Sequence, residues 1–140
     1  MSDILREAVT DYLKNNANLL NKRIYPEAIP QHVKTYPAAA ISRLFVDRKR
    51  SKLGLTGISE SRVSVSILDP DKIDAVRAAD EVEKVFTDFF SGKMTVTIDD
   101  KQYTLHVKSI VMAEQVDFYN DLVDKHQVTS DYIITHENEV

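Results

Sequence analysis

The sequence predicts an α+β domain, with a mainly antiparallel sheet of about four to five strands packed against two helices. Two segments carry apolar residues at steps of three and four, as amphipathic helices do, and shorter segments alternate apolar and polar residues, as half-buried strands do. The 140 residues suit one domain, residues 1–140, which can bury roughly two-thirds of the surface that its unfolded chain exposes. The expected order of elements is helix, strand, strand, helix, strand, strand, strand.

The first helix is expected over residues 4–20, where charged residues fall opposite a stripe of apolar ones. Ser2 or Asp3 can cap its first turn, because a short polar side chain accepts a hydrogen bond from the free amides there. The stripe consists of Leu5, Ala8, Val9, Tyr12, Leu13, Leu19 and Leu20.

Two strands are expected after this helix. Residues 22–37 contain three prolines, which favour extended geometry before them, so this segment is interpreted as an ordered, extended connection. Residues 38–46 form a mostly apolar run of strand length, and residues 63–67 alternate apolar and polar side chains. The polar segment 47–60 between them contains two glycines and predicts a long loop, across which the two strands pair antiparallel.

The second helix is expected to begin at Asp69-Pro70-Asp71. Asp69 is placed at the N-cap and Pro70 at the first helical position, with further negative charge against the positive helix end. Gly92 is well placed to adopt a left-handed conformation just past the end of the helix. The helix is expected to cover the sheet with the stripe Ile73, Val76, Ala79, Val82, Val85, Phe86, Phe89 and Phe90.

The remaining strands follow this helix. Residues 94–107 read as a β-hairpin, because two alternating runs flank a turn at Asp99 and Asp100. A polar stretch over residues 117–125 then leads to a last strand at residues 128–135.

Composition excludes several classes of function. A net charge of −4 gives no general attraction to phosphate backbones or anionic lipid. The absence of cysteine excludes disulfides and a thiolate nucleophile, and suits the cytosol. The first residues do not resemble a secretory signal, and no run of about 18 apolar residues is present, so no membrane partner is expected.

No catalytic, metal-binding or cofactor-binding motif is found. The histidines lie far apart in sequence, and three glycines leave little material for a phosphate loop or a nucleophile elbow. The sequence from Asp69 superficially opens a calcium loop, but Asp74 replaces the required glycine and Asp80 the bidentate glutamate. No cofactor is therefore expected.

One charged segment stands out in this acidic chain, with four cations at Arg48, Lys49, Arg50 and Lys52. As a functional feature, it would contact DNA phosphates or an acidic protein surface and would become ordered in an assembly. The alternative is a solvated loop, since no aromatic residue interleaves to stack on bases. The sequence alone leaves both interpretations open and favours the solvated loop.

The order of elements, with Arg23-Ile24-Tyr25-Pro26 directly after the first helix, resembles the tail-completion or tail-terminator proteins of long-tailed bacteriophages. The resemblance covers nearly the whole chain, including the strand that begins at Pro37. It implies a small, non-enzymatic α+β subunit that forms a ring, commonly a hexamer, which caps the tail tube and joins the head.

The resemblance also implies partners and a location. These are other copies of the chain, the tail tube protein and a head-completion (neck) protein, with non-specific contact to passing DNA, in a virion tail assembled in the host cytoplasm. Two rival interpretations stay open, which are a small nucleic-acid-binding module that uses residues 48–52 and a small enzyme of unfamiliar type.

Overall fold

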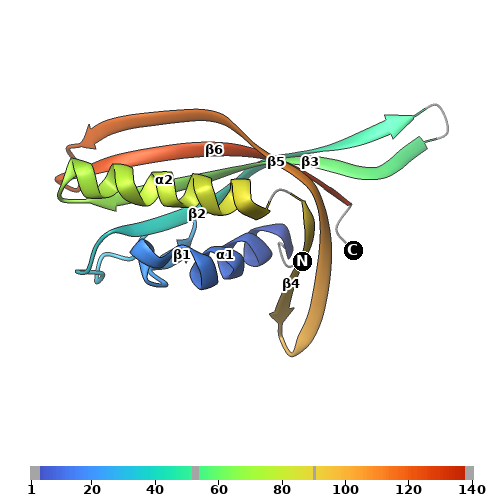
Figure 1. The fold of residues 1–140 in the computed structure, drawn as a ribbon, viewed down its shortest axis with the longest axis horizontal. Helices are drawn as coiled ribbons and strands as arrows, with labels where there is room; N and C mark the ends of the chain where they lie inside the picture. Colours follow the sequence, from blue (N-terminus) through green and yellow to red (C-terminus); the bar gives the residue numbers. More distant parts are fainter. Residues whose placement is uncertain (1–3, 52–53, 90, 138–140) are drawn as a thin grey trace.

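The computed structural model describes the backbone of residues 4–51, 54–89 and 91–137, and the side chains of residues 4–42, 58–89 and 91–137. This part of the chain forms two α-helices, a short 3-10 helix and six strands (Figure 1). The elements are α1 (Ile4–Asn16), η1 (Asn18–Leu20), β1 (Ile24–Pro26), β2 (Ala38–Ser51), β3 (Gly54–Asp69), α2 (Lys72–Phe89), β4 (Gly92–Ile98), β5 (Lys101–Asn120) and β6 (Lys125–Glu137).

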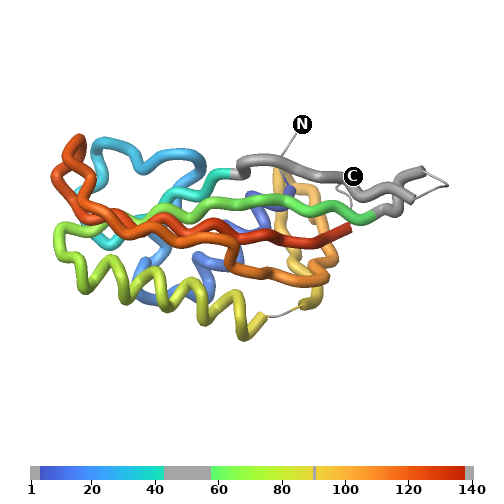
Figure 2. The backbone as a smooth tube through the Cα atoms, turned by 90° about the horizontal axis from the view of Figure 1, so that it is seen from above, coloured from blue at the N-terminus to red at the C-terminus, as the bar shows by residue number. Residues whose placement is uncertain are grey.

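The strands form one mixed sheet in the order β1-β2-β3-β6-β5-β4. Strand β1 runs parallel to β2, and the other neighbours are antiparallel. Helix α2 runs alongside β3 and β6 (Figure 2), and β4 with the first half of β5 curls towards α1 (Figure 1). The predicted α+β class and the helix cover over the sheet are confirmed.

The predicted strand count and order are wrong, because the connection after α1 contains the additional strand β1. Its backbone pairs with β2: the carbonyl of Arg23 accepts from the amide of Ala39 at 2.9 Å, and the amide of Glu27 donates to the carbonyl of Ile41 at 3.0 Å. Backbone groups close to a sheet edge find their partners there, which turns an extended segment into a strand. The order in the described chain is α-β-β-β-α-β-β-β.

The segment 47–60 is not the loop that its polar composition predicts. Strand β2 continues through it to Ser51 and β3 begins at Gly54, with Arg48 opposite Ser59 in the register. The two strands of a hairpin satisfy each other's backbone groups whatever their side chains are, so pairing can continue through a segment of polar sequence. The predicted antiparallel pairing of the two strands is confirmed.

Helix α2 begins at Lys72, two residues after the predicted start at Pro70. Asp71 occupies the N-cap, because its Oδ1 accepts a hydrogen bond from the amide of Ile73 at 2.8 Å. Asp69 is the last residue of β3, where it pairs with His126, so it is still part of the ladder. Its Oδ1 instead accepts from the amide of Asp71 at 2.7 Å and stabilises the turn between strand and helix.

The β4–β5 hairpin is confirmed, and the last two strands are longer than predicted. Asp99 and Asp100 both have positive φ, at 51° and 65°, as a tight type I′ turn requires. Only residues 121–124 of the polar stretch 117–125 connect strands, because β5 runs to Asn120 and β6 begins at Lys125. Gly92 has a φ of 144°, which favours glycine, and it begins β4.

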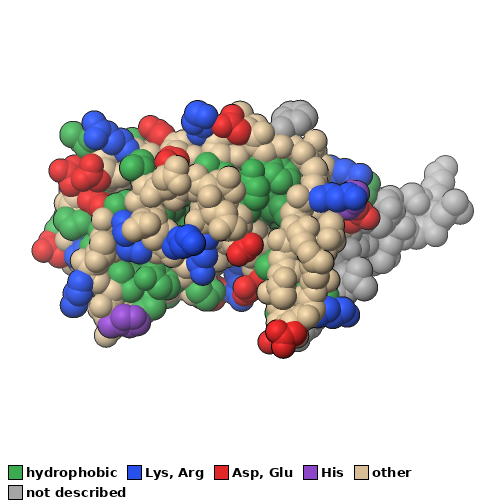
Figure 3. Space-filling model, turned by 60° about the horizontal axis from the view of Figure 1, so that its bottom comes forward, with side chains coloured by type: hydrophobic (Ala, Val, Ile, Leu, Met, Phe, Trp, Pro, Cys, Tyr) green, Lys and Arg blue, Asp and Glu red, His purple; other side chains and the backbone are tan. Residues whose placement is uncertain are grey.

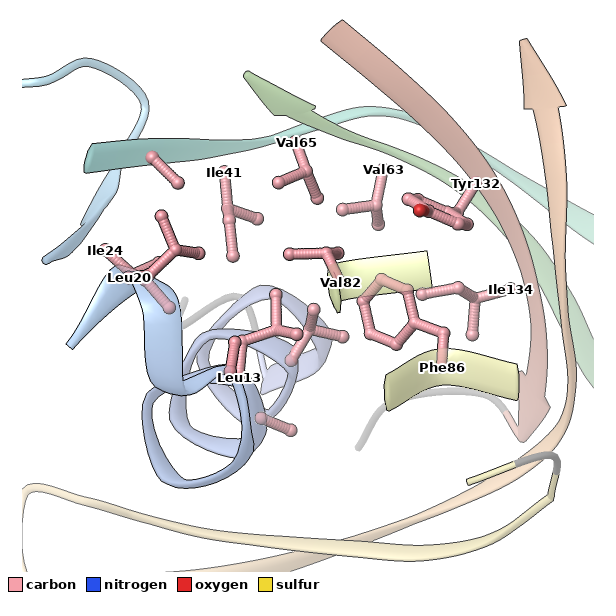
Figure 4. Close-up of a cluster of buried hydrophobic side chains, with 14 of the residues drawn as sticks. Leu13, Leu20, Ile24, Ile41, Val63, Val65, Val82, Phe86, Tyr132 and Ile134 are labelled. Atoms are coloured by element: carbon pink, nitrogen blue, oxygen red, sulfur yellow. The ribbon is translucent and has the colours of Figure 1, made fainter. Parts of the chain in front are cut away.

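The core lies between the two helices and the inner face of the sheet (Figure 4). Phe86 of α2 packs edge-on against Tyr132 of β6, with ring centroids 4.7 Å apart. Ile73 is 62% exposed and does not belong to the core that the predicted stripe suggested, and Phe90 lies outside the described residues. The buried residues of α2 are Ala75, Ala78, Ala79, Val82 and Phe86.

Candidate assembly surface

The pair of side chains closest to a catalytic arrangement is Ser61 of β3 and His136 of β6. The Oγ of Ser61 lies 2.7 Å from Nε2 of His136, but both residues are 0% exposed. The other ring nitrogen, Nδ1, lies 2.6 Å from the carbonyl oxygen of Glu137. A substrate cannot reach a nucleophile that is fully buried between two strands, so this pair serves as an internal polar link.

The other histidines have ordinary surroundings. His106 Nδ1 lies 3.2 Å from Oε1 of Glu137 at the surface, and His126 packs edge-on against Tyr119 with centroids 5.0 Å apart. Within the described ranges, no group of three or more potential ligands could hold a metal ion. No helix in the part of the chain that the structure describes is long and apolar enough to cross a membrane.

A pocket of about 450 Å³ lies between the connection after β1 and the end of the sheet. Lys125 is the neighbour of Tyr36 there, with its Nζ 4.8 Å from the ring centroid. The lining is mostly apolar and brings together no pair of acid and base groups. It consists of Ile29, Pro30, Gln31, Val33, Lys34, Tyr36, Leu68, Pro70, Val123 and Lys125.

The surface around this body carries mixed charge. Figure 3 shows Lys and Arg side chains interspersed with Asp and Glu side chains on one face, with hydrophobic side chains in small groups. Among its described residues, this face therefore has no continuous basic stripe of the kind that binds a nucleic-acid backbone, and it has no large apolar patch.

The predicted site residues fall at separate places. Arg48, Lys49 and Arg50 belong to β2, while Lys52 lies outside the described residues. Asp69 is the last residue of β3 and Pro70 follows it before α2, at the opposite end of β3 from Gly54. Asp69 is 4% exposed, and this burial is the main cause that raises the pKa of its carboxyl group.

Sequence reasoning missed a group of exposed apolar side chains at the far end of β5 and its turn into β6. Leu122 is 96% exposed, and Val111 is 58% exposed. The sequence contains a signal for this group, because large apolar residues lie among the acidic residues of the stretch 117–125. The exposed group consists of Val111, Val116, Phe118, Tyr119, Leu122 and Val123.

The second feature that the sequence does not reveal is a long unpaired sheet edge. Strand β4 pairs only with the first part of β5, up to Val107. Residues 109–120 of β5 pair with β6 on one side, and no strand of the described ranges pairs with them on the other. An unpaired edge offers its amides and carbonyls to another chain.

Of three comparisons with known proteins, only the comparison with solved structures gave a match. No protein-family model matches the chain, and no curated protein matches it in sequence. Among solved structures, the chain is similar to one from a structure titled "Virion of native gene transfer agent (GTA) particle". The match has a TM-score of 0.65 and 15% sequence identity, and it covers 96% of this chain and 95% of that chain. The two chains therefore share a fold over nearly their whole length.

Proposed function

We propose that this protein is a structural virion subunit of a long-tailed phage or phage-like particle. The observation that carries the proposal is the match of fold, at a TM-score of 0.65 over 96% of the chain, with a chain of a gene transfer agent virion. The resemblance of the sequence to tail-terminator proteins indicates the same kind of particle. On this proposal the subunit forms a ring, commonly a hexamer, that caps the tail tube and presents the surface that joins the head.

The distribution of side chains supports assembly rather than chemistry. The exposed apolar group around Leu122 and the unpaired edge of β5 are features that a subunit buries against neighbours. A ring requires a contact between two different patches that closes after a fixed number of copies. The Ser61–His136 pair, in contrast, has no access from solvent.

The partners proposed for the ring are other copies of the chain, the tail tube protein on one side and a neck protein of the head on the other. The segment with Arg48, Lys49, Arg50 and Lys52 is proposed to contact a neighbouring subunit, an acidic partner surface or the DNA that passes through the ring.

The test is the oligomeric state of the full chain with and without tail tubes. We expect native mass spectrometry and sedimentation to show a monomer or weak oligomer at low concentration and a closed ring at high concentration. Electron microscopy is expected to show the ring on the ends of purified tail tubes. A chain that stays monomeric at millimolar concentration and ignores tail tubes contradicts the proposal.

The same measurements, repeated with DNA added, distinguish the proposed ring from the rival function, a small nucleic-acid-binding module. Changing Arg48, Lys49, Arg50 and Lys52 together to Ser removes the four cations of this segment. If the module binds DNA, this variant loses a salt-dependent affinity for DNA that the unchanged protein shows in the absence of any tail. If the ring proposal holds, folding survives in the variant, and assembly or head joining weakens.

A further inference from the structure

The free edge of β5 has the dimensions and the surroundings of a docking site for another strand. Residues 109–120 are long enough, at about 3.4 Å per residue, to present roughly 40 Å of unpaired backbone. An irregularity between Val107 and Ser109 separates this half of the strand from the half that pairs with β4, and a second one lies within the free half, between Met112 and Glu114. Natural sheets usually protect such an edge, so an edge of this length favours a partner that completes it.

The side chains along the edge favour a basic partner strand. Glu114, Asp117 and Asp121 are exposed and follow one another along the edge and the turn after it. Glu114 shares Arg62 with Asp131, at 3.3 Å and 2.8 Å, while the ion pair of Asp117 with Lys72 is longer, at 3.9 Å. Exposed apolar side chains, including Val116 and Phe118, lie between these acids. The edge therefore combines surplus negative charge with apolar surface.

The chain itself contains a strand that fits these requirements. β2 pairs with β1 only at Ala39, Ala40 and Ile41, so from residue 43 onward its outer edge has no neighbouring strand in the described part of the chain. That edge spans roughly 30 Å up to Ser51, and its sequence includes Arg48, Lys49 and Arg50. β6 pairs with β3 no further than Ile58, so β2 up to Ser51 and β3 from Gly54 continue beyond the last residue of β3 that pairs with β6. We name these two paired strand segments, residues 43–51 of β2 and 54–60 of β3, the basic arm.

A subunit cannot place its basic arm on its own β5 edge in this fold. β2 and β5 lie on opposite sides of the β3–β6 pair in the sheet order, so their free edges face in opposite directions. The two edges are different surfaces, and a contact between them joins one copy to the next in a head-to-tail manner. Pairing of two β5 edges with each other would instead bring acidic residues together, which is unfavourable.

We propose that the free edge of β5 receives the β2 strand of the basic arm from a second copy of this chain, so that the sheet continues from one subunit into the next. This inference rests on the proposed ring and names the contact that closes it. Main-chain hydrogen bonds supply the attraction, and the pairing of basic and acidic residues sets the partner and the register. A repeated head-to-tail contact of this kind closes into a ring when its rotation fits.

Cysteine cross-linking tests the contact directly, because the chain contains no cysteine of its own. One preparation carries Ser51→Cys in the basic arm, and a second carries Ala113→Cys, which changes an exposed residue beside the β5 bulge. The two are mixed at an assembling concentration and treated with a short bis-maleimide. We expect the arm–edge adduct to exceed, by about tenfold, the adduct of Ser51→Cys with Asp11→Cys, an exposed site on α1.

Charge reversal tests the specificity. The arm variant is Arg48→Glu with Lys49→Glu and Arg50→Glu, and the edge variant is Asp117→Lys with Asp121→Lys. Each variant alone is expected to lose assembly, whereas an equimolar mixture regains it as rings of alternating subunits, identified by native mass spectrometry. Asp11→Lys with Asp88→Lys, at exposed sites on the helices, is the matched control and is expected to assemble normally.

The outcomes separate this inference from the proposed function. If unchanged subunits assemble but the arm–edge adduct is no more abundant than the control adduct, or the mixture of variants fails to assemble, the arm–edge contact is overturned and the ring stands. If unchanged subunits neither associate at millimolar concentration nor bind tail tubes, the proposed function fails and the contact fails with it.

Discussion

Ser61 on β3 and His136 on β6 form a buried hydrogen bond of 2.7 Å that joins the two central strands of the sheet. The carbonyl oxygen of Glu137, 2.6 Å from Nδ1, can only accept, so Nδ1 carries the hydrogen and Nε2 accepts from the Ser61 hydroxyl. Both side chains are 0% exposed, so losing either partner leaves a polar group without water.

We therefore expect Ser61→Ala to lower the free energy of unfolding by about 1 to 3 kcal/mol, because a buried hydrogen bond between the two central strands is lost. Denaturant unfolding provides the measurement. Ser64→Ala is the control, since Ser64 lies on the same strand and is 8% exposed but does not face this histidine. Equal losses in the two variants would show that the bond contributes nothing specific.

Asp71→Ala is expected to cost about 0.5 to 2 kcal/mol, because helix α2 loses the acceptor for the amide of Ile73. The sequence assigns this loss to Asp69, but the structure gives the cap to Asp71. Asp74→Ala, in the first turn of the same helix, removes a carboxylate without removing the cap. Thermal and denaturant midpoints are the measurement, and an unchanged midpoint in Asp71→Ala would contradict the cap.

Asp69→Asn is expected to change how stability depends on pH. Burial is the main cause that raises the pKa of Asp69, with Asp74 and Asp71 adding to it, while the hydrogen bond from the Asp71 amide and the charge of Arg23 act in the opposite direction. The folded state therefore binds this proton more tightly than the unfolded state, and stability falls as pH rises from the ordinary carboxyl pKa of 3.8 through the raised pKa.

Asparagine still offers an oxygen to the Asp71 amide but does not ionise. The stability of Asp69→Asn relative to the unchanged protein should therefore increase between about pH 3 and pH 7. Urea unfolding at several pH values measures this difference. A difference that is constant with pH would show that Asp69 titrates normally.

Phe86→Ala is expected to cost about 3 to 5 kcal/mol, because it opens a cavity where the ring packs against Tyr132. Ile73→Ala on the same helix is the control, since its side chain is 62% exposed and its loss should change stability by about 0.5 kcal/mol or less. Calorimetry or denaturant unfolding compares them. Similar losses would place the core-facing side of α2 elsewhere.

Leu122→Ser is expected to leave stability within about 0.5 kcal/mol of the unchanged protein, because the side chain is 96% exposed. Assembly, on the proposed function, should weaken in the same variant because an apolar contact is lost. Sedimentation at several concentrations measures this. Normal assembly would remove Leu122 from the interface.

The sequence predicted those elements whose side chains alternate between core and solvent. The β4–β5 hairpin and helix α2 were recognisable because one face of each is buried, and burial is what hydrophobic periodicity reports. The distal parts of β2 and β3 are mostly polar in sequence, and the distal part of β5 mixes exposed apolar and acidic residues, so their backbone pairing leaves no regular alternation in the pattern. The three-residue strand β1 is too short to show a period.

The assembly surface was still less predictable. The apolar residues from Val116 to Val123 are visible in the sequence, but the pattern does not show that their side chains are exposed. The free edge of β5 depends on the order of strands, and that order depends on contacts between residues far apart in the chain. The segment around Arg48 was recognised by its charge and assigned the wrong backbone conformation.

The position of β6 in the middle of the sheet determines when the sheet can be completed during translation. Its residues are translated after those of every other strand, yet they pair with β3 on one side and β5 on the other. Until residues 125–137 have emerged from the ribosome, β6 cannot bridge β3 and β5, and strands β1 to β3 remain separate from β4 and β5. Completion of the fold coincides with the arrival of residues 125–137. Before β6 is in place, the edges of β3 and β5 can pair with strands of neighbouring nascent chains on the same polysome. We therefore expect the need for chaperones to be greatest at this point in synthesis.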